Sequence, residues 1–337
     1  MKYSVLFLIL VLSLPILFIL DILNGSVNIP FSEFLNAFQG IEIGRAHEII
    51  IFESRIPKAL TAIVCGASLA ISGLLMQTLF RNPLAGPYIL GVSSGAGLGV
   101  AIAVMGAGAI GISIINSSIA LPLASMLGSL GILLVLFLVS LKVKDIMTLL
   151  ILGIMIGSIA IAFIGIIQYF TSDAQLKSFL IWTLGSLEGV SYASLSKMGS
   201  VLLVCAVLAF SLIKSLNAIL LGEQYAKSLG IALVKSRLLI ILIAGSLAGM
   251  VTAYCGPIGF IGIIIPHLCR LLFQTANHKI LIPSSMILGA SLLLFSDLIA
   301  HFPSGGISIP INSITSIIGI PIIIWIIFNK RSVSSSF

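Results

Sequence analysis

The sequence predicts an all-α membrane protein with one polytopic domain, and its composition is the first reason. Hydrophobic residues make up 59% of the 337 residues and charged residues only 8%. The mean hydropathy of +1.26 lies far above the range of soluble proteins. No stretch is polar enough to form a soluble domain, so we expect a single transmembrane domain over residues 1–337.

Apolar runs of about 17 to 25 residues, the length needed to cross a hydrocarbon core, divide the chain into ten candidate spans. Each span should be an α-helix, because backbone polar groups in lipid need partners within their own segment. The first run could be a signal peptide, but no small-x-small cleavage site follows it, so we expect an uncleaved helix. The predicted spans are 3–23, 58–79, 89–108, 116–140, 147–168, 196–214, 236–255, 258–274, 281–301 and 311–328.

The basic residues predict an orientation in a bacterial or archaeal inner membrane, with both termini in the cytoplasm. This arrangement puts twelve of the 17 lysines and arginines inside and five outside, as the positive-inside rule requires. Because these residues sit at the ends of apolar runs and not on one surface, the net charge of +7 does not indicate a nucleic-acid partner. The inside set is Lys2, Arg81, Lys142, Lys144, Lys214, Lys227, Lys235, Arg237, Arg270, Lys279, Lys330 and Arg331, and the outside set is Arg45, Arg55, Lys58, Lys177 and Lys197.

Motifs for catalysis or cofactor binding are absent, and we expect no metal site and no cofactor on this chain. Residues 106–111 spell GxGxxG, but they follow a membrane span and lack the βαβ context of a nucleotide site. No Walker A loop occurs, so ATP and its magnesium would be bound by a different chain. The four cysteines lie in apolar runs without metal-ligand spacing, and the four histidines are scattered. An intramembrane enzyme would need a catalytic dyad or a metal pair, and neither is evident.

Three polar or Gly/Pro-rich stretches interrupt the apolar pattern. The first starts with Arg55-Ile56-Pro57-Lys58 and continues to the Arg81–Pro87 loop. The second is an inner loop over 216–230 with a short helical pattern bounded by glycines. The third is Gly256–Gly262 with the following Ile265-Pro266-His267 and Arg270. A protein that only spans the membrane would have little use for them.

Taken together, these stretches resemble the FecCD-like family, the permeases of type II ABC importers for iron chelates, haem and vitamin B12. The resemblance covers nearly the whole chain, and its motifs occur in order between the predicted spans. They are the RxP(R/K) entry at 55–58, the NPLAxP loop at 82–87, LGVSxGAG at 90–97, WTLGSL at 182–187, LGExxAxSLG at 221–230, GPIGFIG at 256–262, the Pro-His pair at 266–267, and Thr315 with Gly319-Ile320-Pro321.

The resemblance implies a homodimer of ten-helix subunits with the translocation path at the subunit interface. It implies two cytoplasmic ATPase subunits below and one periplasmic substrate-binding protein above. The chain itself would therefore catalyse no chemistry and would work as the permease subunit.

The resemblance makes the loop at 216–231 the coupling helix that contacts the ATPase. We expect Leu221, Ala226 and Leu229 to dock into a groove on the ATPase, with Glu223 and Lys227 as a solvated rim. Gly222 and Gly230 would bound the helix. The alternative is an ordinary amphipathic connector.

Basic residues at the outer end of the second span, against the positive-inside trend, are interpreted as a docking site for the binding protein. By the resemblance, Arg55 and Lys58 would receive acidic residues of that protein, whereas the alternative is snorkelling side chains at the membrane boundary. The family's third basic position is here His301, so docking would be pH-sensitive. Ser308 and Asn312 also depart from the family pattern, where Glu and Gly are usual.

A cytoplasmic gate is expected where two inner loops meet. By the resemblance, Asn82 and Leu84 line the gate, and Ile146, Met147 and Thr148 oppose them. The two prolines of the first loop would stiffen it, since proline fixes φ, although they would equally serve to end one helix and begin the next.

The transported solute is the least determined part of the function. A metal chelate (iron-siderophore, haem or cobalamin) ranks narrowly ahead of a small metal oxyanion such as molybdate or tungstate, because it is the commoner role among relatives. An ion-coupled secondary transporter is a rival class, but it should place acidic residues near the bilayer middle, and Asp297 is almost alone there.

Overall fold

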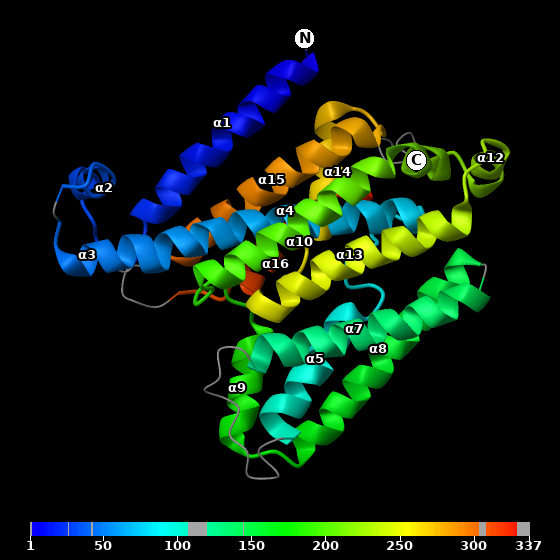
Figure 1. Cartoon of the computed structure of the whole chain (residues 1–337), viewed down its shortest axis with the longest axis horizontal. Helices are drawn as coiled ribbons and strands as arrows, with labels where there is room; N and C mark the ends of the chain where they lie inside the picture. The colour runs from blue at the N-terminus through cyan, green and yellow to red at the C-terminus, as the bar shows by residue number, and fades with distance from the viewer. Residues whose placement is uncertain are drawn as a thin grey trace.

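The computed structural model describes residues 2–25, 27–41, 43–106, 120–143, 145–302 and 308–328, and within them every regular element is a helix (Figure 1). Most of the GxGxxG run, and Lys144, Lys330 and Arg331 of the predicted inside set, lie outside these residues. The helices are α1 (Lys2–Leu23), α2 (Phe31–Phe38), α3 (Arg45–Ile49), α4 (Ile56–Phe80), α5 (Val92–Ala101), α7 (Ala120–Lys142), α8 (Ile146–Tyr169), α9 (Asp173–Thr183), α10 (Tyr192–Ser211), α11 (Ile213–Leu220), α12 (Glu223–Ser228), α13 (Leu233–Cys255), α14 (Ile261–Phe273), α15 (His278–Ala300) and α16 (Ile311–Phe328), with π-helical turns η1 (Ile50–Arg55) and η2 (Ile102–Gly106).

The ten predicted spans all correspond to apolar helices of the described residues. Seven helices are long and apolar enough to cross a membrane, and three shorter apolar helices cover Val92–Gly106, Ile261–Phe273 and Ile311–Ile326. Two boundaries differ clearly from the prediction. The span predicted over 258–274 is helical only over Ile261–Phe273, because the glycine- and proline-containing stretch before it is irregular. The second span is much longer than predicted, since α3, η1 and α4 form one helix over Arg45–Phe80.

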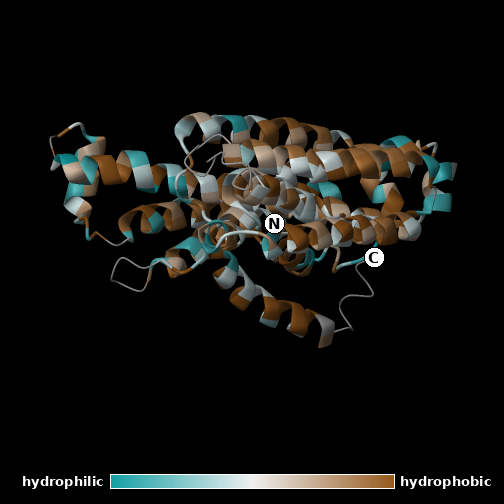
Figure 2. Cartoon of the chain, turned by 90° about the horizontal axis from the view of Figure 1, so that it is seen from below, coloured by the Kyte–Doolittle hydropathy of each residue, from teal (hydrophilic) through white to brown (hydrophobic). Residues whose placement is uncertain are grey.

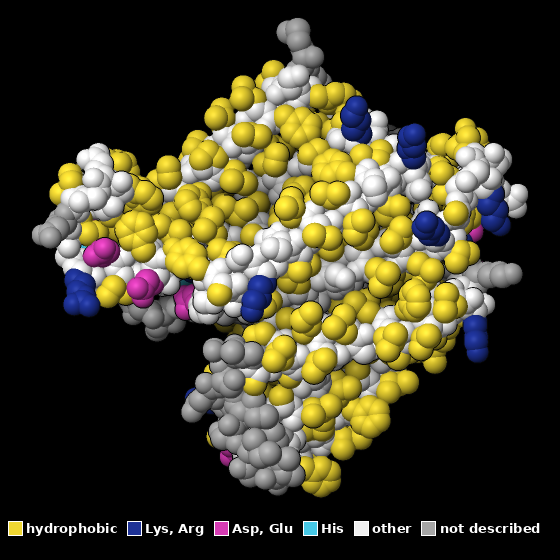
Figure 3. All heavy atoms as spheres, in the orientation of Figure 1, with side chains coloured by type: hydrophobic (Ala, Val, Ile, Leu, Met, Phe, Trp, Pro, Cys, Tyr) yellow, Lys and Arg dark blue, Asp and Glu magenta, His cyan; other side chains and the backbone are white. Residues whose placement is uncertain are grey.

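The polar residues gather at the two ends of the long axis of the molecule. Figure 2 shows hydrophobic helices through the middle and hydrophilic segments toward both ends. One end carries α2 and α3, here called the α2 end, and the other carries α12, here called the α12 end (Figure 1). In the space-filling view most of the visible lysines and arginines lie toward the α12 end (Figure 3). An apolar band between two polar ends is the surface that a bilayer requires.

Helix α4 forms the centre of the bundle and is buried along most of its length, as expected for a helix that is apolar on every side. It packs against α13, α14 and α15. The crossings are close because glycine faces backbone: a Cβ on Gly66 would stand 2.2 Å from the Gly289 carbonyl oxygen, and one on Gly73 would stand 1.7 Å from that of Gly262. Helices in lipid gain their packing energy from such close approach.

Helices α4 and α13 run in opposite directions (Figure 1), and similar elements follow each of them, α5, α7 and α8 after α4 and α14, α15 and α16 after α13. In each half a long buried helix leads through an irregular segment into a short helix, α5 or α14. Glycines of the two long helices make corresponding contacts: Gly66 of α4 packs on α15, and Gly245 of α13 packs on Leu133 of α7. Inverted repeats of this kind are common among transporters.

Helices α2, α3, α9 and α11 were not predicted from the sequence. They have 8, 5, 11 and 8 residues, respectively, too few to give an apolar run of membrane-spanning length. Helix α11 matters most for function, because it leads directly into the predicted coupling helix.

Candidate functional site

The predicted coupling loop forms a compact two-helix turn at the α12 end, here called the coupling segment (residues 216–231). Helix α11 ends at Leu220, and α12 covers Glu223–Ser228. The glycines on either side take conformations that other residues rarely adopt, with φ of +114° at Gly222 and +76° at Gly230. The glycines therefore set where the short helix begins and ends, as the sequence indicated.

One face of the coupling segment is apolar and exposed. Leu221, Tyr225 and Leu229 have exposed fractions of 65%, 50% and 56%, and we call these three side chains the apolar stripe. Ala226 is completely buried, which corrects the expectation that it docks into a partner. Its small side chain instead lets α12 lie against the rest of the chain. Tyr225 was not singled out from the sequence, although the four-residue spacing pointed to it.

The charged residues of the coupling segment also differ from the expected solvated rim. Glu223 Oε1 forms an ion pair with Nη2 of Arg237 on α13, so it fixes α12 to the next membrane helix. Lys227 is exposed, as expected for a rim residue. The Glu223–Arg237 ion pair thus holds α12 against α13, and the apolar stripe faces outward.

The two predicted gate loops lie at the helix ends expected for them. Arg81 ends α4 in a left-handed conformation with φ of 46°, and Asn82 Oδ1 then accepts a hydrogen bond of 2.9 Å from the Leu84 backbone N–H. This local bond makes a tight turn that carries Leu84 to the surface, where 43% of it is exposed. Sequence reasoning attributed the stiffness of this loop to its prolines, and the Asn82 turn adds to it.

The second gate loop is shaped by an N-cap. Asp145 accepts hydrogen bonds from the Thr148 hydroxyl and backbone N–H, at 2.6 and 2.7 Å, and these bonds lower the pKa of the Asp145 carboxyl below its usual value. Met147 is 51% exposed. Ile146 lines a small cavity of about 60 Å³ together with Arg237.

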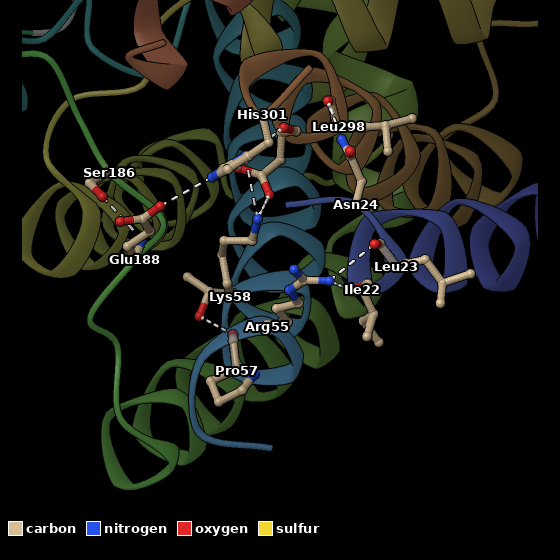
Figure 4. Close-up of polar contacts among 12 residues, drawn as sticks. Ile22, Leu23, Asn24, Arg55, Pro57, Lys58, Ser186, Glu188, Leu298 and His301 are labelled. Atoms are coloured by element: carbon tan, nitrogen blue, oxygen red, sulfur yellow. Dashed lines mark hydrogen bonds and ion pairs between the residues drawn. The ribbon is translucent and has the colours of Figure 1, made fainter. Parts of the chain in front are cut away.

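Arg55 at the α2 end is buried, which corrects the premise that it is a surface cation. Its guanidinium donates hydrogen bonds to the backbone carbonyls of Ile22, at 2.7 Å, of Leu23, at 3.0 Å, and of Val27 (Figure 4). The last carbonyls of a helix have no intrahelical partner and carry the negative end of its dipole. Arg55 therefore caps the C-terminus of α1.

Lys58 is also buried, and its partner is the aspartate that sequence analysis found almost alone. Lys58 Nζ lies 2.7 Å from Asp297 Oδ2, and the two side chains are 6% and 4% exposed. Both are therefore neutralised inside the protein, which differs from the expectation of a cation free for docking. Asp21 of α1 is buried close to the same charges.

His301 joins this pair to the surface. Its Nδ1 contacts the Asp297 carbonyl oxygen at 2.9 Å, and its Nε2 contacts Glu188 Oε1 at 3.1 Å (Figure 4). Both partners are acceptors, and Nδ1 also lies 3.4 Å from Lys58 Nζ, so a ring protonated on both nitrogens would donate to both partners. The Glu188 bond raises the pKa of His301, and it lowers the pKa of Glu188. We call Lys58, Asp297, His301 and Glu188 the ionic cluster.

The cysteines and histidines form no evident metal centre. No group of three or more His, Cys, Asp or Glu side chains arranged to hold a metal occurs in the part of the chain that the structure describes. The Sγ atoms of Cys65 and Cys255 lie 3.5 Å apart in the interior, as two thiols in contact.

Comparison with known proteins identifies the family of this chain. A model of the FecCD transport family matches residues 11–329, nearly the whole chain. The chain belongs to the FecCD transport family. It is therefore a membrane permease subunit of the ABC importer class, as the sequence motifs indicated.

Several relatives of this FecCD family member have names that state a solute. The vitamin B12 import system permease protein BtuC of Klebsiella pneumoniae is 34% identical over 96% of this chain and 93% of the relative. The hemin transport permease HmuU of Yersinia pestis is 34% identical over 82% of each chain. The molybdate import permease MolB of Haemophilus influenzae is 35% identical over 84% of this chain and 82% of the relative.

A solved structure shares the fold of this family member over its full length. It is described as a metal-chelate type ABC transporter in an inward-facing conformation, and the TM-score is 0.83 at 30% identity, with 97% of this chain and 99% of that chain covered.

Removing one member of the buried ion pair should destabilise the protein more than removing both. Lys58→Met leaves the Asp297 carboxylate uncompensated, which we expect to cost about 3–5 kcal/mol of unfolding free energy. The double variant Lys58→Met/Asp297→Leu should recover most of that loss. Thermal unfolding of the purified variants in detergent measures the cycle, and additive losses would show that the pair is not coupled.

The ionic cluster should make stability depend on pH. The raised pKa of His301 gives a contribution that is complete below its ordinary value of 6.5 and is lost as pH rises through the higher folded value. Thermal stability should thus fall as pH rises above 6.5, by about 0.5–1 kcal/mol because Glu188 is half exposed. Glu188→Gln should reduce this dependence. An equal pH profile in the variant would contradict the assignment.

Proposed function

We propose that this permease passes a metal chelate across the inner membrane as one half of a homodimer, driven by two separate ATPase subunits. A substrate-binding protein delivers the solute at the opposite face. In this arrangement the α12 end is cytoplasmic and the α2 end is periplasmic, with both chain termini in the cytoplasm. The single observation that carries the proposal is the exposed apolar stripe of the coupling segment, in a chain of the FecCD family.

The coupling segment supports an ATPase partner because it exposes large apolar side chains at a polar end of the molecule. Leu221, Tyr225 and Leu229 lie on and beside α12, at one polar end of the molecule (Figure 1), so lipid does not account for them. Large apolar side chains exposed on and beside a short helix suit a groove on a partner. The Glu223–Arg237 ion pair joins the segment to α13, so movement of the partner would reach the membrane helices.

Docking of the binding protein at the α2 end takes a different form from the one expected from sequence. Arg55 and Lys58 hold α1, α4 and α15 together, and Glu188, with a side chain 58% exposed, is the accessible member of the ionic cluster. We infer that His301 and Glu188 present a surface to the binding protein, while the buried cations fix its geometry. This docking would weaken as His301 loses its proton.

The gate is assigned to Asn82 and Leu84 on one side and to Ile146, Met147 and Thr148 on the other. Exposed Leu84 and Met147 sit on turns that their neighbours hold by side-chain hydrogen bonds, so they project from a rigid frame. Apolar side chains at such a position would close a path against water and ions.

The solute class is proposed from the relatives and ranked as before. Vitamin B12 and haem are metal chelates, and these two names occur among relatives as similar to this chain as the molybdate permease. Import of an oxyanion by the same architecture is the second candidate, favoured by the 35% identity to MolB. An ion-coupled mechanism loses its main support, because Asp297 lies near the end of α15 and is already paired with Lys58.

Leu229→Glu should abolish association with the ATPase while leaving membrane insertion intact. A buried charge in the centre of an apolar contact should cost about 2 kcal/mol or more, a loss of about thirtyfold in affinity. The matched control is Ser228→Glu, which adds the same charge beside the stripe. Pull-down of the ATPase by the purified permease measures both, and equal binding of the two variants would refute the role of the coupling segment.

The partner binding protein should bind a metal chelate and not an oxyanion. Calorimetry with a ferric siderophore, haem, cobalamin, molybdate and tungstate compares the two candidates directly. Heat of binding only with molybdate or tungstate would reverse the ranking.

A further inference from the structure

A chain of buried hydrogen bonds joins the coupling segment to α4 at the α12 end. His278, the first residue of α15, is fully buried between the two. Its Nε2 lies 2.8 Å from the hydroxyl of Thr78 on α4, and its Nδ1 lies 2.7 Å from Oδ1 of Asn217 on α11. The imidazole ring thus bridges two helices that are far apart in sequence.

The backbone N–H of His278 sets the direction of the hydrogen bonds to Asn217. The His278 backbone N–H donates to Asn217 Oδ1 at 3.0 Å, so this atom is the amide oxygen and acts as an acceptor. His278 Nδ1, which contacts the same oxygen, must therefore be protonated and donate to it. The Thr78 hydroxyl has one proton and two acceptors within reach, Nε2 of the neutral ring and the Leu74 carbonyl oxygen, each at 2.8 Å. Asn217 Nδ2 in turn donates to Asn277 Oδ1 at 3.1 Å, which also caps α15 by accepting from the Lys279 N–H.

The positions at the two ends of the chain give it a function. Thr78 lies two residues before α4 ends at Phe80, where the loop with Asn82 and Leu84 begins. Asn217 lies within α11, whose last residue, Leu220, precedes the exposed stripe. Helix α11 also packs directly on α4 and α15.

We propose that His278, Thr78 and Asn217 transmit displacement of the coupling segment to the gate loop that follows α4. The inference rests on the proposed function and adds the positioning residues through which it would operate. Sliding of α11 past α4 would leave buried donors and acceptors without partners, which is costly, so the two helices move together. The imidazole ring of His278 is planar and rigid, so it would transmit displacement of α11 to α4 in either direction.

The test measures gate movement without any solute. Nitroxide labels are attached at Leu84→Cys and Met147→Cys, which are exposed, whereas the four native cysteines are buried and protected from labelling. Electron–electron distance measurements on the reconstituted complex with the ATPase, before and after ATP with vanadate, report gate movement. ATP hydrolysis and thermal stability are recorded in parallel.

Thr78→Val keeps the side-chain shape and removes the hydroxyl, and Asn217→Ala breaks the other end. Both should lose the nucleotide-dependent distance change, and the complex with Thr78→Val, which lies outside the coupling segment, should still assemble and hydrolyse ATP. Thr78→Ser should restore the change, because it restores the hydroxyl. The matched control is Ser72→Ala, which removes another buried bond between helices, from Ser72 to the Ala244 carbonyl on α13, away from the coupling segment.

An undiminished distance change in Thr78→Val, or the same loss in Ser72→Ala, would overturn the transmission role. A loss of thermal stability in Thr78→Val that accounts for its defect and is not reversed in Thr78→Ser would also overturn it. Failure of the unmodified permease to bind the ATPase would instead overturn the proposed function on which the inference rests.

Discussion

Close contact between helix backbones at glycine pairs is the constraint on which this structure depends. Water-driven burial contributes little between helices in lipid, so α4 is held by direct packing, and Gly66 and Gly73 allow its neighbours to approach without a side chain between them. The same approach brings α15 near enough for Lys58 to meet Asp297 at one end and for Thr78 to meet His278 at the other. Polar contacts in the interior are thus a consequence of backbone packing.

The two polar ends of the molecule solve opposite problems. At the α2 end, Arg55, Lys58 and Asp297 are buried and paired, so the ends of α1, α4 and α15 are joined around Arg55 and the ionic cluster. At the α12 end, apolar side chains are exposed on a small helix that is fixed only from behind. The joined helix ends at the α2 end and the exposed apolar surface at the α12 end fit the proposal that an ATPase binds the α12 end and moves the membrane helices.

Hydropathy was sufficient to predict the ten apolar spans, because lipid forces each span to saturate its own backbone, and the glycine spacing predicted the short helix α12. Hydropathy did not predict the short helices α2, α3, α9 and α11, because each is too short to give an apolar run of membrane-spanning length. The exposure of individual side chains was predicted less well than the positions of the helices. Arg55, Lys58 and Ala226 were expected at surfaces, but whether a side chain is exposed depends on residues distant in sequence, such as Asp297 for Lys58. The role of His278 was also out of reach, because Thr78 and Asn217 approach it only in the folded chain.

The capping of α1 by Arg55 bears on how the chain is made. The ribosome produces α1 well before residue 55, so the carbonyls of Ile22 and Leu23 lack their final donor until the next long helix emerges. The first helix therefore reaches its mature end structure only when the second lies beside it. The contact between the first two long helices is thus completed by an arginine that is synthesised after the helix it caps.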